Sequence, residues 1–108
     1  MTAVQLPPPS PAMTVHEAAA ALRGTAQAAV AAMARNDYWS AGWASGVANA
    51  VGGYEGDLAG FFSPELAVAF ADWLDTAASD NARHGTPLPP LALTAAQALA
   101  PPAVVSAR

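Results

Sequence analysis

The sequence predicts an all-α fold, a small domain of three or four helices preceded by an extended proline-rich arm. Apolar residues recur at steps of three and four along most of the chain, the spacing that places them on one helix face. About 30 of the 108 residues are alanine, the strongest helix former, although GC-rich codons would also favour alanine and exclude lysine. Signals for a helix start and stop bracket residues 63–85.

We divide the chain into an arm (1–13), a helical domain (14–100) and a C-terminal tail (101–108). Four of the first thirteen residues are proline, which favours an extended arm. Thr14 and Glu17 form a capping box, which predicts that the first helix starts at Thr14. Asn36-Asp37 is expected to end this helix, with Asp37 capping the next one. One continuous helix through both residues is the alternative.

The stretch 38–54 is uncharged and is expected to form the second, central helix, stopped by Gly52-Gly53. One face would carry Trp39, Trp43, Val47, Ala50 and Tyr54, and the other Gly42, Ser45, Gly46 and Asn49. Small residues spaced as in Gly42-x-x-x-Gly46 let two helix backbones approach closely. That approach could be made by the first helix or by another copy of the chain.

Residues 54–62 contain two glycines and are expected to form a loop, whose Phe61 and Phe62 plug the core or an interface. The third helix should run from Ser63, its N-cap, to Gly85. Its predicted apolar stripe is Leu66, Phe70, Trp73, Leu74 and Ala77. A short fourth helix over about 91–100 follows from a second capping box at Thr94 and the stop at Pro101-Pro102. We expect Trp39, Trp43 and Trp73 to meet at a dry core.

No residue pattern indicates catalysis, so we expect a non-enzymatic protein without a cofactor or a metal. His16-Glu17 lacks the second histidine of a zinc motif, and His16 is expected to be solvated or capping. Asp72 and Asp75 share one side of the third helix, where paired carboxylates are usually a solvated surface. The net charge of -4 and the scattered arginines argue against nucleic-acid binding.

The chain is expected to be cytoplasmic or virion-associated, without a secretory signal peptide. Membrane insertion is not expected, because the uncharged stretch 38–54 is shorter than the about 20 residues that a membrane-spanning helix needs.

The segment PELAVAFADWLDTAASDNARHG, followed after a proline linker by LALTAAQALA, resembles a pattern in small uncharacterised proteins of actinobacteria and their phages. In that pattern an A-x-A-x-A-D-W/L-L-D helix precedes a short helix that ends in an alanine-rich run. The match covers residues 64–100, and the second helix here lacks the histidine and arginine of the pattern. The resemblance implies a phage or prophage setting and no activity.

We therefore expect a protein–protein interaction protein, a subunit of a homo-oligomeric assembly such as a virion. The alternative is a small phage-encoded inhibitor of a host defence or regulatory protein. The candidate interface residues are Trp39, Gly42, Trp43, Gly46, Phe61 and Phe62.

Overall fold

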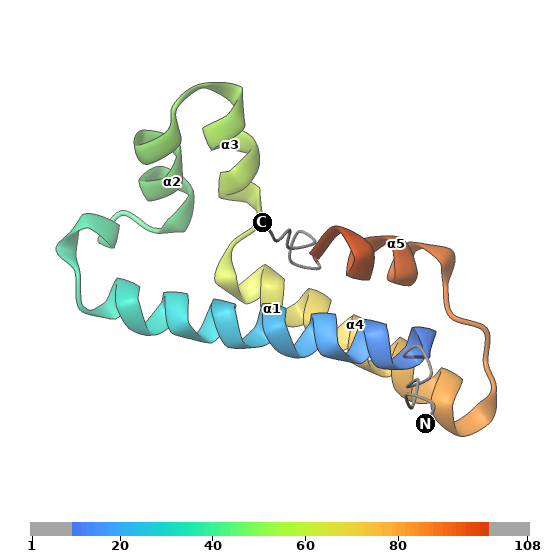
Figure 1. Cartoon of the computed structure of the whole chain (residues 1–108). Coiled ribbons are helices and arrows are strands. Elements are labelled where there is room, and N and C mark those ends of the chain that lie inside the picture. Colours follow the sequence, from blue (N-terminus) through green and yellow to red (C-terminus); the bar gives the residue numbers. More distant parts are fainter. Residues whose placement is uncertain (1–9, 100–108) are drawn as a thin grey trace, which may run out of the picture.

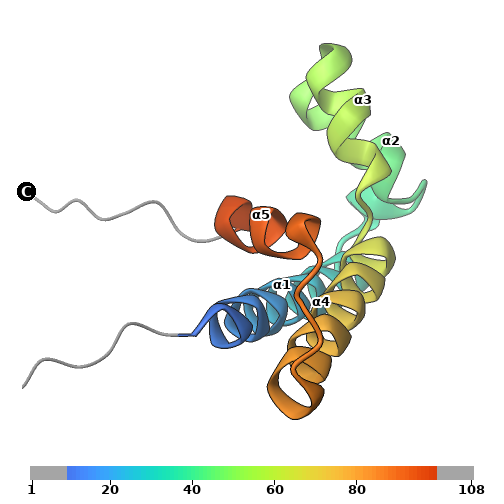
Figure 2. The ribbon, with the colours of Figure 1, turned by 90° about the vertical axis from the view of Figure 1, so that its right-hand side faces the viewer.

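The computed structural model of the protein describes residues 10–99, which are mostly helical and contain no strand, so the all-α prediction is confirmed. The elements are α1 (Pro11–Ala34), a 3-10 helix (Asp37–Trp39), α2 (Trp43–Val51), α3 (Gly53–Phe61), α4 (Pro64–His84) and α5 (Pro90–Leu99). Helices α1 and α4 lie side by side, and α5 packs mainly on α1 (Figure 1). Helices α2 and α3 form a hairpin that projects away from it (Figure 2).

Helix α1 begins at Pro11, three residues earlier than predicted. The Ser10 hydroxyl accepts a hydrogen bond from the Met13 amide at 3.1 Å, and proline suits the first helical position because its missing amide would have no partner there. Thr14 therefore lies inside the helix, and the predicted capping box is wrong. The rest of the predicted arm, residues 1–9, lies outside the described residues.

The break after α1 is confirmed, and the alternative of one continuous helix is wrong, because α1 ends at Ala34. The cap that follows is Asn36 rather than Asp37: the Asn36 side chain accepts from the Tyr38 amide at 2.9 Å and starts the 3-10 helix. Helix α2 begins only at Trp43, after Gly42 with a φ of 98°. The predicted central helix is therefore real but much shorter, and it ends at Gly52 as expected.

The core lies between α1, α4 and α5 and is built mainly from alanine. Its buried residues are Ala12, Val15, Ala19, Ala71, Leu74, Ala78, Ala92 and Ala96. Val15 and Leu74 are the largest fully buried side chains. Small residues on facing stripes let the helix axes approach closely, which leaves no space for an indole ring.

The predicted dry centre of three tryptophans is wrong. Trp39 and Trp43 stack on each other, with ring centroids 5.4 Å apart, at the base of the hairpin. Trp73 stacks instead on Phe70 and is 40% exposed. The indoles therefore form two separate clusters rather than one core.

Both ends of α4 are confirmed: the Ser63 hydroxyl accepts from the Leu66 amide, and Gly85 takes the left-handed conformation. Its predicted apolar stripe is partly wrong, since the buried positions are Pro64, Ala67, Ala71, Leu74 and Ala78. Leu66 and Trp73 lie exposed beside that stripe.

Helix α5 confirms the short fourth helix, but Thr94 lies inside it, so the second capping box is also wrong. The predicted stop at Pro101-Pro102 and the tail 101–108 lie outside the described residues. Within residues 10–99, no helix combines the length and apolar character that crossing a membrane requires.

Candidate interaction surface

The α2–α3 hairpin is held together by close backbone packing of very small residues. Gly56 and Gly60 of α3 face Ala48 and Ala44 of α2. A Cβ atom added at Gly56 would lie 3.1 Å from the Ala48 Cα, and one added at Gly60 would lie 3.2 Å from the Ala44 Cα. The predicted loop over 54–62 is therefore wrong, because the glycines read as helix breakers form the packing face of a helix.

The tight turn between the two helices requires glycine. Gly52 and Gly53 have φ angles of 79° and 64°, in the left-handed region that side chains with a Cβ rarely adopt. These two residues reverse the chain and let α3 return along α2.

Gly42 and Gly46, predicted to admit another helix backbone, have different roles. Gly42 supplies the positive φ that starts α2, and an added Cβ would meet nothing within 4 Å. Gly46 lies directly beneath the Trp39 indole, where an added Cβ would collide with the ring. At neither position would an added Cβ come closest to the backbone of another α-helix, so the close approach predicted for this pair is made by Gly56 and Gly60.

Three aromatic residues join the 3-10 helix to the hairpin. The Tyr38 ring packs edge-to-face on Trp39 at 5.0 Å, and its hydroxyl donates to the Gly46 carbonyl at 2.6 Å. The Trp43 indole N–H donates to the Ala59 carbonyl of α3 at 3.3 Å. Trp39 and Trp43, predicted as interface residues, are thus partly buried and stabilise the hairpin internally.

The outer face of α3 carries three large apolar side chains that contact almost nothing. Tyr54, Leu58 and Phe61 are 89%, 72% and 78% exposed. They follow one another at steps of four and three, on the side of α3 opposite its glycines. We call these three residues the α3 stripe. Of the predicted interface residues, only Phe61 belongs to it.

Carboxylates border the α3 stripe on both sides. At about 100° per residue, Glu55 falls on one side of the stripe and Asp57 on the other. Both are exposed, and neither takes part in an ion pair within residues 10–99. The surface is therefore apolar in the middle and acidic at its edges.

Phe62 lies where the hairpin meets the α1/α4 pair. Its ring packs edge-to-face against Phe70 at 6.2 Å, and it remains 40% exposed. Together with Trp43 it lines an apolar cavity of about 140 Å³. The other lining residues are Leu22, Thr25, Ala26, Ala29, Pro64 and Ala67. This cavity is too apolar to orient a polar substrate, and we interpret it as imperfect packing at the base of the hairpin.

A cluster of charged residues that no sequence pattern predicted joins α1 to α4. Asp75 accepts hydrogen bonds from His16 Nδ1 at 2.9 Å and from Arg23 Nη2 at 2.7 Å. Arg23 also donates to Asp72 at 2.8 Å. Burial alone would raise the pKa of Asp75, but the hydrogen bonds from Arg23 and His16 outweigh it and hold the pKa below its usual value. The carboxylates expected to be solvated are therefore paired across two helices.

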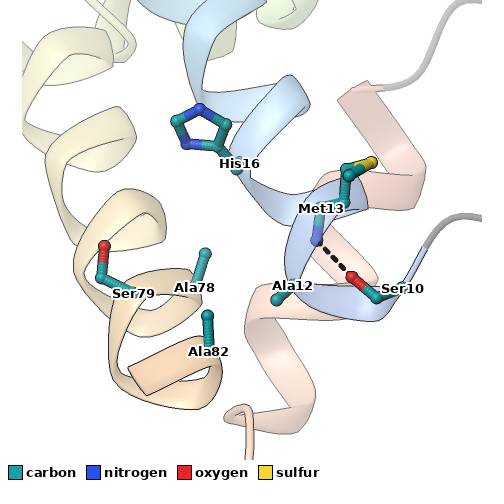
Figure 3. Close-up of a pocket in the computed structure, with 7 residues that line it drawn as sticks. All are labelled: Ser10, Ala12, Met13, His16, Ala78, Ser79 and Ala82. Carbon is teal, nitrogen blue, oxygen red and sulfur yellow. Dashed lines mark hydrogen bonds between the residues drawn. The ribbon is translucent and has the colours of Figure 1, made fainter.

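This cluster does not form a nucleophilic site. His16 lines a surface pocket of about 260 Å³ with Ser79, as a catalytic histidine and serine would, but the two side chains lie apart on facing helices (Figure 3). No hydrogen bond joins them, whereas nucleophile and base must lie within hydrogen-bonding reach. Over residues 10–99, no three side chains of the metal-ligating types gather into a possible metal site.

Compared with known protein families, with curated proteins and with solved structures, the chain matches none. The resemblance of residues 64–100 to small actinobacterial and phage proteins therefore stays a prediction.

Proposed function

We propose that the protein is a non-enzymatic interaction protein that binds a partner protein through the α3 stripe. The observation that carries this proposal is the exposure of Tyr54, Leu58 and Phe61, at 72–89%, on a hairpin that projects from the body. Isolated exposed apolar residues are common, but a contiguous row on a projecting element is typical of a binding surface.

The spacing of the α3 stripe supports one mode of recognition. Apolar anchors at positions i, i+4 and i+7 are how an amphipathic helix fills a groove on another protein. The glycine–alanine packing and the aromatic residues at its base hold α3 in its helical form before any partner arrives. A preorganised helix binds more tightly than a flexible segment with the same side chains, because less conformational entropy is lost on binding.

The assembly in which the protein acts is a further part of this proposal. A subunit of an oligomeric assembly, such as a phage virion, would use the stripe for a permanent contact. An inhibitor of a host protein is the second candidate, favoured by the small size of the surface: one nine-residue helix is enough to occupy a regulatory groove.

Photo-crosslinking in living cells of the organism whose genome encodes the protein tests the proposal. Leu58 is replaced by p-benzoylphenylalanine, and Leu91 of α5 is the matched control because the two leucines are 72% and 73% exposed. We expect a discrete protein adduct from position 58 and none of the same mass from position 91. Identical adduct patterns from both positions would refute the proposal. The identity of the adduct separates a virion protein from a host regulatory protein.

A further inference from the structure

We propose that the partner of the α3 stripe is a different protein, whose apolar surface is bordered by lysine or arginine side chains, and not a second copy of this chain. This inference rests on the proposed function and adds the chemistry of the partner to it. The two carboxylates beside the stripe and the positions of the chain's cations both favour such a partner.

The hairpin carries only negative charge. From Asn36 to Phe62 the chain has Asp37, Glu55 and Asp57 and no arginine, lysine or histidine. If two copies packed stripe against stripe, the border of each would face the carboxylates of the other. Like charges placed across an interface cost free energy and select against that pairing.

The rest of the described chain does not place arginines on both sides of one apolar surface. Arg35 and Arg83 are exposed and outside the ion pairs, but they lie at opposite ends of the α1/α4 pair. Arg23 is already bonded to Asp72 and Asp75. An apolar hollow of about 440 Å³ on α1 and α4, large enough for one aromatic ring, has Glu65 as its one charged lining residue. A second copy that received the stripe in this hollow would meet its acidic edges with another carboxylate. Opposite charge on both edges of the stripe therefore has to come from a different protein.

The charge-reversed chain is a defined probe for such a partner. The double variant Glu55→Lys/Asp57→Lys presents the same apolar stripe with lysine borders, and both residues are exposed. Wild type, the variant and their equimolar mixture are compared by sedimentation equilibrium at up to about 0.5 mM, because weak contacts dissociate near the millimolar range. Circular dichroism verifies that the variants are helical, and the single variant Asp57→Lys replaces the double one if the latter unfolds.

We expect wild type and variant to be monomeric alone and to form a one-to-one complex when mixed. The mixed complex should be at least about tenfold tighter than either self-association, and it should weaken between about 0.05 and 0.5 M salt. Leu58→Asp in the wild-type chain should abolish the complex, and the control Leu91→Asp should leave it intact.

Three results would overturn the inference. Self-association of wild type that Leu58→Asp abolishes would make a second copy the partner. A mixture of folded chains that stays monomeric would remove charge as the basis of recognition. Binding to phosphatidylcholine vesicles that Leu58→Asp abolishes would assign the stripe to lipid. The first two results leave the proposed function intact, which the adduct from position 58 tests independently, whereas the third would also argue against the proposed function.

Discussion

Gly56→Ala tests the close packing of the hairpin, because at this position alanine should raise helix propensity but also overlap with the facing helix. Alanine in place of a helical glycine stabilises a helix by about 1 kcal/mol. At Gly56, however, the new Cβ would lie 3.1 Å from the Cα and 3.2 Å from the carbonyl oxygen of Ala48, and backbone atoms cannot rotate away. Overpacking of this kind costs about 1–3 kcal/mol. We expect Gly56→Ala to leave stability unchanged or to lower it by up to about 2 kcal/mol.

Two control variants separate propensity from packing. At Gly24 of α1 an added Cβ meets nothing within 4 Å, so Gly24→Ala should gain about 1 kcal/mol, a rise in Tm of about 4–8 °C. Ala59 is exposed on α3 beside the packing face, so Ala59→Gly measures what propensity contributes to the hairpin itself. If packing were irrelevant, Gly56→Ala would gain as much as Ala59→Gly loses.

The assay is urea unfolding followed by far-ultraviolet circular dichroism and by tryptophan fluorescence. Circular dichroism reports all helices, whereas two of the three tryptophans, Trp39 and Trp43, lie at the hairpin. A Gly56→Ala protein that is stabilised by about 1 kcal/mol in both signals would refute the close contact between α2 and α3.

Three further predictions concern the body of the molecule. Leu74→Ala should lower the free energy of unfolding by about 2–5 kcal/mol in urea titrations, since Leu74 is fully buried; a loss under about 1 kcal/mol would contradict the core described above. Ser63→Ala should cost about 0.5–2 kcal/mol through loss of the α4 cap, while Ser79→Ala on the exposed face serves as the control. The pKa of Asp75 is lowered in the folded state, so its stabilising contribution is complete above the ordinary value of 3.8 and is lost as the pH falls through the folded value. Asp75→Asn should therefore reduce the difference in urea midpoint between neutral pH and about pH 3. An unchanged difference would show that another group causes the loss of stability in acid.

Helix α4 was predictable because its signals are local. Ser63-Pro64 at its start, Arg83 and His84 in its last turn and Gly85 after it each act within a few residues of the helix end. The same Ser-Pro signal stands at Ser10-Pro11, and it was missed because the prolines before it favoured an extended arm. Thr14 and Thr94 have the spacing of capping boxes but lie inside helices, because a cap requires that the chain before it is not helical.

The core and the hairpin were harder to predict for a different reason. In a chain this rich in alanine, every face of a helix contains small apolar residues, so periodicity does not identify the buried face. We assigned the core to the largest side chains, but most of the buried residues are alanines, such as Ala71, Ala78 and Ala92. Gly56 and Gly60 could have indicated α3, since they match the four-residue spacing of Ala44 and Ala48. The pairing of Arg23 with Asp72 and Asp75 joins residues 49 and 52 positions apart, beyond the reach of a local pattern.

The division between small buried residues and large exposed ones also bears on function. Burying a leucine or phenylalanine side chain contributes about 1.5–3 kcal/mol, and the isolated chain forgoes that contribution at Tyr54, Leu58 and Phe61. A loop tip could carry such residues by chance, but here a turn of two glycines and a helix face without side chains direct all three outward. The residues that make α3 pack so closely on α2 are therefore the same ones that fix the stripe on the opposite face. A substitution at Gly56 or Gly60 should accordingly weaken partner binding as well as stability, although neither residue lies on the binding surface.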